Sequence, residues 1–405
     1  MNKLDSSNKQ SSGIQVRAGY KTYTIAIIAI IAALIIYSPV DPLPYTFPTP
    51  LPKLEGGLKR NTILQRAERW FTGKLVGPES FAVDKNGTLY TGTADGKIFA
   101  IRNTSLTLVA HTGIQHSLCG TPEYEPQCGR PKGMKIGPDG KLYVVDSYKG
   151  LLRVNVSTGD VETLVSNEQG SDGVPFKFLN SMDISDDGII YFTDSTYKWE
   201  RRNFRYAVIE TRPDGRVMQY NIKTGVCNTL ISGLYLANGI SLSYDQTYLL
   251  ISEMSIASIR RYFIKGPRRG ESDVFCDNLP GYPDNIKLNA NNNYYIGLAS
   301  VRFDGSSPIG SFLDLIGPYP NVKKFVTSIT PLSAYNVFMP KHAMAIEIDH
   351  DGYIVNSLQD PGARIIGAVS EIFEVNGTIY IGHYQSNYLG VLKSSNIEQV
   401  ETKAG

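Results

Sequence analysis

One short pattern recurs along the chain and limits the possible folds more than any other feature of the sequence. Five windows align without gaps, GPESFAVDKNGTLY, RPKGMKIGPDGKLY, FLNSMDISDDGIIY, LANGISLSYDQTYL and YPDNIKLNANNNYY, and a sixth, AVSEIFEVNGTIYI, lies near the C-terminus. Each window is typical of a short apolar strand, a turn of Gly, Asp or Asn, and a second strand rich in aromatic residues. The period of this repeat therefore decides the fold.

The spacing of the windows predicts a β-propeller. Further strand pairs, such as KIFAIRN with LTLVAHT, lie between the windows and bring each repeat to four antiparallel strands. Four strands in about 50 residues is the size of one propeller blade. Six such blades fill residues 70–395, so we predict an all-β, six-bladed β-propeller domain over residues 61–400.

The blade count depends on one ambiguous segment. The window HAMAIEIDHDGYIV would raise the count to seven, but without it the fifth blade would keep only two strands. We therefore assign it as the outer hairpin of the fifth blade. The last blade has three C-terminal strands and lacks a fourth, and residues 69–76 lie where a fourth strand precedes each window. They are expected to close the ring and remove the exposed sheet edges.

The N-terminal part predicts a membrane anchor. Residues 22–38 are uncharged and near the lower limit of length for a bilayer-spanning helix. Basic residues precede this segment, and residues 38–52 contain no Lys or Arg, so the positive-inside rule places residues 1–21 in the cytosol. Residues 39–60 are interpreted as a proline-rich stalk that holds the domain off the membrane. The propeller is then extracellular or lumenal, at the plasma membrane or the endoplasmic reticulum.

A cleaved signal peptide is the alternative interpretation of this N-terminus. A polar start of 21 residues is long for a signal peptide, and the bulky end Leu34–Tyr37 lacks a clear small-x-small cleavage site. We therefore expect a single-pass type II membrane protein. The net charge of +2 provides no large field that would attract nucleic acid.

The residues that open the windows are expected to meet on the propeller axis, because the first strand of each blade lines the central channel. They are Glu79, Lys132, Asn180, Asn238, Asp284 and approximately Val369-Ser370. Two carboxylates and two amides provide hard oxygen ligands, with Asn285 as a fifth candidate, and such a set suits Ca²⁺ far better than zinc. The plainer interpretation is that these are turn and solvent residues.

Strand direction predicts which loops surround this site. Four N-x-S/T sequons fall in turns on the face away from the site and are candidate glycosylation sites: Asn86, Asn103, Asn155 and Asn376. The long insertions at residues 196–214 and 299–341, and the loop of residues 119–128, are expected to roof the pocket. Cys119 and Cys128 bracket that loop on the oxidising side, so we expect a disulfide. Cys227 and Cys276 lie in outer strands that splay apart and are not expected to bond.

Three segments carry a resemblance to a known family. The stretch ASIRRYFIKGPRRGESDVFCDNLPGYPDNIKL resembles the signature of the strictosidine synthase-like family, and FTDSTYKWERRNF and CGTPEYEPQCGRPKG agree with it. The resemblance covers about residues 60–395 and extends to a superfamily with paraoxonases and gluconolactonase-type six-bladed propellers. It implies arylesterase-type activity. It also implies calcium ligands at the positions of Glu79, Asn180, Asn238, Asp284 and Asn285, all of which are present.

Two positions depart from the patterns of this superfamily. Paraoxonase-like esterases carry a catalytic His where this chain has Lys132, which leaves proton transfer without its family residue. Strictosidine synthase uses a Glu in the last blade where this chain has Ser370, and strand alternation turns the adjacent Glu371 away. Alkaloid synthesis is therefore not expected.

The remaining catalytic candidates are weak. Lys132 could bind a substrate anion or act as a base if its pKa is lowered. His383 ends a second strand at the pocket end and could act as acid or base there, although a lone His in such a place is more often structural or solvated.

Two functions therefore remain open from the sequence. The first is a membrane-anchored, calcium-dependent hydrolase of small apolar esters or lactones. The second is a non-enzymatic ectodomain with structural calcium, whose propeller face binds a protein or lipid partner.

Overall fold

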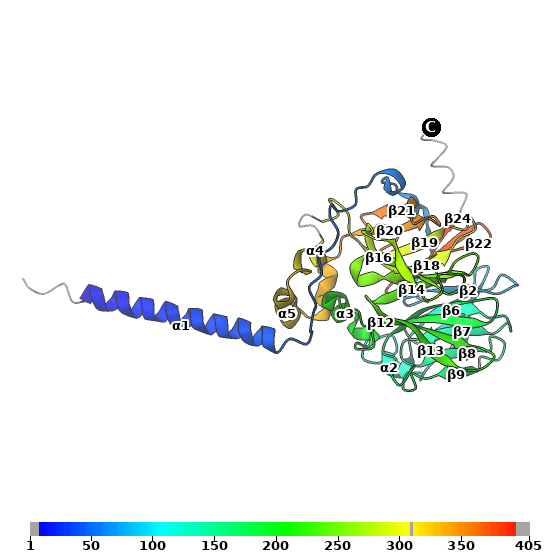
Figure 1. Ribbon diagram of the computed structural model, residues 1–405, viewed down its shortest axis with the longest axis horizontal. Coiled ribbons are helices and arrows are strands. Elements are labelled where there is room, and N and C mark those ends of the chain that lie inside the picture. Colours follow the sequence, from blue (N-terminus) through cyan, green and yellow to red (C-terminus); the bar gives the residue numbers. More distant parts are fainter. Residues whose placement is uncertain (1–7, 308–310, 394–405) are drawn as a thin grey trace, which may run out of the picture.

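A computed structural model of the chain describes residues 8–307 and 311–393. Residues 1–7 of the predicted cytosolic tail and residues 394–400 of the predicted propeller domain lie outside this range. The described residues form six four-stranded antiparallel sheets arranged around an axis (Figure 1). The predicted six-bladed β-propeller is therefore confirmed, and each repeated window forms the first two strands of one sheet.

Each blade runs from an inner strand at the axis to an outer strand at the surface. Blade 1 contains β2 (Phe81–Val83), β3 (Leu89–Gly92), β4 (Lys97–Arg102) and β5 (Ser105–His111). Blade 2 contains β6 (Pro131–Ile136), β7 (Leu142–Asp146), β8 (Gly150–Val154) and β9 (Val161–Val165). Blade 3 contains β10 (Leu179–Ile184), β11 (Ile189–Asp194), β12 (Gly215–Asn221) and β13 (Cys227–Leu234).

The other three blades complete the ring. Blade 4 contains β14 (Ala237–Leu242), β15 (Tyr248–Glu253), β16 (Ser258–Phe263) and β17 (Ser272–Cys276). Blade 5 contains β18 (Gly281–Leu288), β19 (Tyr294–Val301), β20 (His342–Ile348) and β21 (Ile354–Pro361). Blade 6 contains β22 (Glu371–Val375), β23 (Thr378–Gly382), β24 (Leu389–Lys393) and, from the start of the domain, β1 (Glu68–Trp70).

The turns of the repeat explain why the windows fold alike. In the first window Asp84 Oδ1 accepts hydrogen bonds from the backbone N–H groups of Asn86 and Thr88, both at 2.9 Å. Asn289 Oδ1 makes the same pair of bonds in the fifth window, with Asn291 and Asn293, both at 3.0 Å. Such Asx turns reverse the chain locally, which places the two strands side by side.

The N- and C-terminal ends of the domain share the last blade. Strand β1 pairs with β24 in the register Glu68↔Val391, Arg69↔Gly390 and Trp70↔Leu389. At the inner edge Glu371 bridges β22 to blade 1, accepting hydrogen bonds from Ser80 Oγ (2.7 Å) and Phe81 N (3.0 Å). These contacts confirm the predicted closure. They also confirm the assignment of β20 and β21 to blade 5, because both lie in the sheet of β18 and β19.

Helices cover one side of the propeller (Figure 1). The α-helices are α1 (Asn8–Ile36), α2 (Glu125–Cys128), α3 (Phe204–Glu210), α4 (Phe312–Ile316) and α5 (Pro320–Ile329). The 3₁₀ helices are η1 (Gly56–Leu58), η2 (Ile63–Arg66), η3 (Arg201–Asn203), η4 (Met254–Ile256) and η5 (Leu332–Phe338). Helices α3, α4 and α5 lie between the blades and α1, and they come from the two long insertions that were expected to form the roof.

Helix α1 extends away from the body of the molecule (Figure 1). It includes most of the predicted membrane segment, residues 22–38, and ends at Ile36. Within residues 8–307 and 311–393, no helix has the length and apolar character needed to cross a membrane. Insertion of residues 22–38 into a membrane therefore stays a prediction.

Residues 39–60, which we call the strap, differ from the expected free stalk because they pack on the propeller. Phe47 is 5% exposed and belongs to the core of blades 4 and 5. Arg302, which is completely buried, donates to the Pro48 carbonyl oxygen at 2.9 Å and forms an ion pair with Asp314 at 2.7 Å. The backbone of Leu43 bonds Glu210 of α3, at 2.9 Å. The prolines lack backbone donors, but the carbonyl oxygens of Pro48, Pro50 and Pro52 accept hydrogen bonds from Arg302, Asn278 and Asp304.

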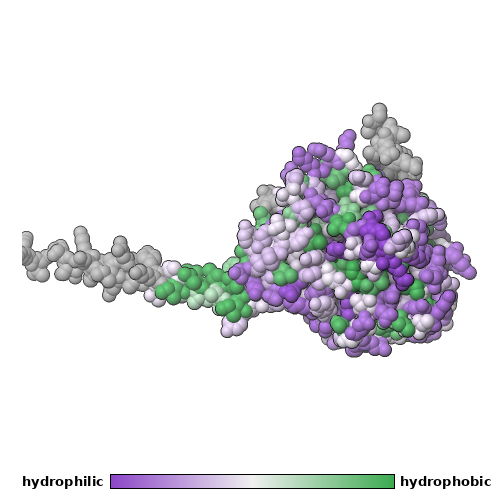
Figure 2. Space-filling model, viewed as in Figure 1, coloured by the Kyte–Doolittle hydropathy of each residue, from purple (hydrophilic) through white to green (hydrophobic). Residues whose placement is uncertain are grey.

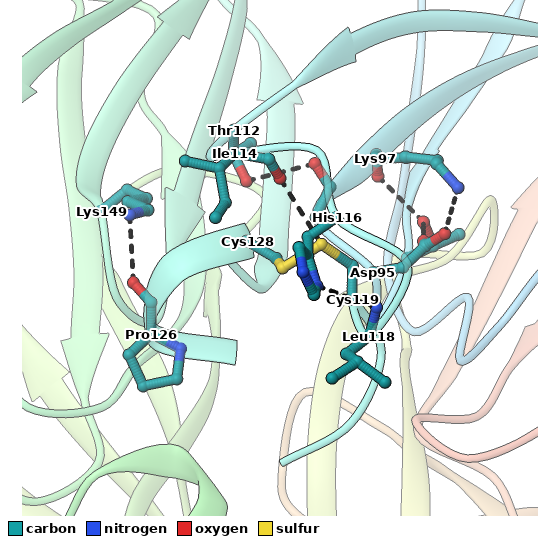
Figure 3. Close-up of a disulfide and its surroundings, with 12 residues drawn as sticks. Asp95, Lys97, Thr112, Ile114, His116, Leu118, Cys119, Pro126, Cys128 and Lys149 are labelled. Carbon is teal, nitrogen blue, oxygen red and sulfur yellow. Dashed lines mark hydrogen bonds and ion pairs between the residues drawn. A yellow bond between two sulfur atoms is a disulfide. The ribbon is translucent and has the colours of Figure 1, made fainter. Parts of the chain in front are cut away.

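The cysteine predictions are confirmed. Cys119 and Cys128 form a disulfide, with their Cα atoms 5.7 Å apart, and Cys227 and Cys276 are free thiols. Figure 3 shows the disulfide joining its loop to α2, where Lys149 Nζ donates to the Pro126 carbonyl oxygen at 3.0 Å. The disulfide fixes the loop beside blade 2.

The four sequons occupy the turns predicted for them. Asn86 and Asn376 lie between the first and second strands of their blades, and Asn103 and Asn155 between the third and fourth strands. These turns lie at the end of the strands opposite to Glu79, which precedes β2.

Candidate metal and substrate site

The residues that open five of the six windows meet in one small pocket on the axis, whereas Val369 and Ser370 of the sixth window do not line it. Glu79, Lys132, Asn180, Asn238 and Asp284 all line this axial pocket, which has a volume of about 30 Å³. Asn285 follows Asp284 in β18 and is buried beside it. The sequence prediction that these side chains converge is supported by this arrangement.

The five predicted calcium ligands share an unusual property. Each is at most 5% exposed, and each has a buried side-chain oxygen without a hydrogen-bond partner within the described part of the chain. The oxygens are Glu79 Oε2, Asn180 Oδ1, Asn238 Oδ1, Asp284 Oδ1 and Asn285 Oδ1. A buried polar atom without a partner costs about 1–3 kcal/mol. Carboxylate and amide oxygens are ligands that suit Ca²⁺, so the chemistry of this set fits the predicted ion.

Neighbouring groups turn the amide oxygens of two ligands toward the pocket. Asn180 Nδ2 donates to Ser195 Oγ at 3.1 Å, and Asn238 Nδ2 lies 3.3 Å from Met254 Sδ. Because the amide nitrogen of each side chain is held by these neighbours, the oxygen is the end that remains without a partner. The described residues contain no group of three or more His, Cys, Asp or Glu side chains that could hold a metal, so the amides are essential to this set.

A lysine lies among the candidate ligands. Lys132 is 4% exposed, and its ammonium group forms an ion pair with Glu79 Oε1. Burial favours the neutral carboxylic acid, but the charges of Lys132 and Arg130 hold the pKa of Glu79 below its usual value. Burial and the charge of Glu79 raise the pKa of Asp284 to about 7. Lys132 therefore stabilises the charged form of one ligand while adding positive charge next to the others.

Sequence reasoning missed a second layer of charge around the pocket. Arg201 lines the axial pocket and donates to Glu125 Oε1 at 2.7 Å. The other oxygen of Glu125 accepts a hydrogen bond from Tyr148 at 2.8 Å. Glu125 belongs to the disulfide loop, whose residues line neither the axial pocket nor the cavity above it. The expectation that this loop forms part of the roof is therefore corrected: it acts on the pocket through Arg201.

A larger apolar cavity adjoins the axial pocket. It has a volume of about 130 Å³ and lies under α3 and α4, where Phe204, Val208, Phe312 and Leu313 are among its lining residues. The two spaces share lining residues: Phe204, Met254, Ala299 and Tyr384. The insertions at residues 196–214 and 299–341 thus roof the site as expected. A ligand could place a polar group at the axial oxygens and an apolar body in the cavity.

His383 is a weaker candidate in the structure than Lys132. It follows β23, and its ring packs against Tyr384 with centroids 4.7 Å apart, but it lines neither space. Burial lowers the pKa of His383 to about 4, so the ring is neutral at pH 7 and cannot serve as a proton donor there. Glu371 lines neither space, which agrees with the expectation for it. Ser370 lines neither space either, but its carbonyl oxygen accepts a hydrogen bond from Asn285 N at 3.0 Å, so it lies beside the candidate ligands.

The first testable prediction concerns Asp284. Asp284→Asn keeps the shape of the side chain but removes one of two ligand charges, so calcium affinity should fall at least about tenfold. Isothermal titration measures the change. Asp273→Asn, in outer strand β17, is the matched control and should bind calcium normally. Equal affinity in Asp284→Asn and the wild type would contradict the site.

The second prediction concerns Lys132. A positive charge close to a cation site weakens binding of the cation, and Lys132 also engages one oxygen of Glu79. Lys132→Met should therefore raise calcium affinity in the same titration. Unchanged binding would contradict this competition, and weaker binding would show that the ammonium group supports the ligand set.

The comparisons with known proteins agree with the sequence resemblance. Residues 180–267 match the family model of strictosidine synthase, and residues 56–101 match that of the strictosidine synthase-like N-terminal region. Adipocyte plasma membrane-associated protein from Gallus gallus is 38% identical over 90% of this chain and 87% of its own length. The Homo sapiens protein of that name is 36% identical over 88% and 85%, respectively.

A plant relative and two solved structures extend this picture. Arabidopsis thaliana strictosidine synthase-like 3 is 34% identical over 84% of this chain and 88% of its own length. A gluconolactonase from Xanthomonas campestris aligns with a TM-score of 0.55 and 12% identity, covering 85% of this chain and 98% of that chain. A calcium-binding regucalcin from Agrobacterium tumefaciens aligns with a TM-score of 0.53 and 13% identity, covering 80% and 92%. These two show the fold alone. The chain belongs to the strictosidine synthase-like family, together with the adipocyte plasma membrane-associated proteins.

Proposed function

We propose that this protein is a membrane-anchored, calcium-dependent hydrolase of small apolar esters or lactones. The observation that carries the proposal is the set of five buried, unpartnered oxygens directly beneath an apolar cavity. Glu79, Asn180, Asn238, Asp284 and Asn285 would hold the ion. When bound, calcium would polarise a carbonyl oxygen and stabilise the charge that develops on it.

The residues of the chain divide the remaining tasks. The cavity under α3 and α4 binds the apolar part of the substrate and excludes water, which strengthens electrostatic interactions at the axial pocket. Lys132 keeps Glu79 ionised and lies where it can donate to a substrate oxygen. Arg201 is held by Glu125 and adds positive charge at the edge of the same pocket, which favours an anionic product.

The membrane anchor and the glycans are part of the same proposal. Residues 22–38 would insert into the membrane and leave the propeller on the extracellular or lumenal side, and the name of the related proteins supports membrane association. Glycans on Asn86, Asn103, Asn155 and Asn376 would then lie on the face opposite the site and leave the roofed face free.

A second function is favoured by one observation. Lys132 occupies the place of the catalytic His of paraoxonase-like esterases and forms an ion pair with Glu79. An ectodomain in which calcium is only structural, and which binds a protein or lipid partner, would need no general base.

The test is hydrolysis of phenyl acetate by the full-length protein in detergent, with calcium and after its removal with EGTA. The hydrolase proposal predicts activity that EGTA abolishes and calcium restores, and a lower kcat/KM in Lys132→Met even at saturating calcium. The full chain is needed because the strap packs on the propeller. Absent activity, with a melting temperature that calcium still raises, would contradict the hydrolase and select the structural-calcium alternative.

A further inference from the structure

Helix α5 buries two polar side chains and leaves two large apolar ones, Val322 and Ile329, at the surface. Lys323 is 1% exposed, and its ammonium group donates to the Leu43 carbonyl oxygen (2.8 Å) and to Thr211 Oγ1 (3.1 Å). Thr327, also buried, lies with its hydroxyl oxygen 3.2 Å from that of Ser38. A helix of a globular protein normally buries its apolar side, as Val326 of α5 does, so the exposure of Val322 and Ile329 departs from that pattern.

The exposed residues of α5 belong to a larger apolar patch, which we call the roof patch. It comprises Leu315 (51% exposed), Tyr319 (60%), Val322 (42%) and Ile329 (53%), from α4, α5 and the turn between them. Single exposed apolar residues are common on proteins and need no explanation. This patch differs because it adjoins the apolar surface of α1.

Helix α1 ends against α5. Ser328 Oγ donates to the Leu34 carbonyl oxygen at 2.8 Å, and Ser38 Oγ donates to the Lys324 carbonyl oxygen at 3.0 Å. Upstream of this contact α1 exposes large apolar side chains, among them Ile25 (68%) and Ile28 (61%). Figure 2 shows this apolar surface continuing along α1 up to the body of the molecule.

The strap fixes the direction in which α1 leaves the propeller. Its bonds to Glu210 of α3, to Gly317 after α4 and to Arg302 hold residues 43–48 on the propeller, a few residues after the end of α1 at Ile36. Helix α1 therefore extends from the face that carries α4 and α5 (Figure 1). Two carboxylates at this junction are paired with cations: Asp41 with Arg212 at 3.0 Å and Lys324 at 3.7 Å, and Glu210 with Lys198 at 2.5 Å. Such pairing suits a lipid headgroup region.

We propose that the roof patch docks in the headgroup–acyl boundary of a phospholipid bilayer, on the side of the molecule from which α1 enters that bilayer. This inference rests on the proposed membrane anchor but not on catalysis. An apolar surface of this kind inserts about 5–10 Å into the boundary. Phe312 and Leu313 of α4 line the apolar cavity, while Leu315 of the same helix belongs to the patch, so docking places the cavity next to the lipid.

The experiment uses full-length protein in nanodiscs made with phosphatidylcholine that is brominated near the upper end of its acyl chains. Bromine quenches tryptophan only at short range. Val322→Trp places the probe in the roof patch, and the native Trp70 and Trp199 are accounted for by the wild-type protein. Tyr244→Trp is the matched control, because Tyr244 is 72% exposed and lines a pocket at the opposite end of the axis.

Docking predicts that the fluorescence added by Val322→Trp is largely lost in brominated relative to unbrominated nanodiscs, while that added by Tyr244→Trp is retained. Equal retention in both variants overturns the inference. Both sites are exposed, so the melting temperatures of the variants should equal that of the wild type, and Tyr319→Trp provides a conservative second probe.

Two further measurements distinguish a failure of the docking inference from a failure of the proposed membrane anchor or of the proposed hydrolase. Release of the chain from membranes by alkaline carbonate would refute the anchor, and the docking inference would fall with it. Quenching of Val322→Trp in a protein that does not hydrolyse phenyl acetate would support docking and reject only the hydrolase.

Discussion

Five buried side-chain oxygens at and beside the axial pocket, which lack hydrogen-bond partners among the residues the structure describes, are the constraint on which the rest of the structure depends. Each one opposes folding by about 1–3 kcal/mol unless something compensates it. Closure of the ring by β1 and β24 brings them together, because each inner strand then starts at the same end of the axis. A bound cation would replace this cost with a favourable interaction. The free energy of binding would then add to the stability of the folded protein.

The surrounding charges set how strongly such a cation would bind. Lys132 pairs with Glu79, and Arg201 pairs with Glu125, so the pocket already contains positive charge that a paired carboxylate balances in each case. Both proposed functions share this arrangement of charges. They differ in the role that they give to the apolar cavity next to it. A hydrolase needs the apolar cavity as a substrate site, whereas an interaction domain needs only a stable propeller.

Much of the fold could be predicted from the sequence because its information is local. The turns at Asp84 and Asn289 are formed by residues close in sequence, and a strand period of two places the window-opening residues on the same side of each blade. The candidate ligands Glu79 and Asp284 could be found for the same reason. The disulfide could be predicted from the short spacing of its cysteines in a segment expected to be extracellular or lumenal.

The features that were not predicted depend on contacts between distant residues. Arg302 bonds Pro48 of the strap, which lies 254 positions away in the sequence, and no local sequence pattern predicts that contact. Arg201 and Glu125 come from different blades, and Lys323 is a lysine that its sequence neighbours would place at the surface. Lys323 and Arg302 are charged residues of the insertion 299–341, but Asp304, Asp314 and Lys324 lie in it too, so the sequence does not indicate which charges are buried.

The most direct test of this account is the calcium content of the folded protein. Native mass spectrometry of the full chain, purified without chelator and exchanged into buffer with trace calcium, counts bound ions directly. The account predicts one calcium ion per chain in the wild type and none in the Asp284→Asn variant at the same free calcium concentration. A wild-type chain that remains folded and binds no calcium under these conditions would contradict it.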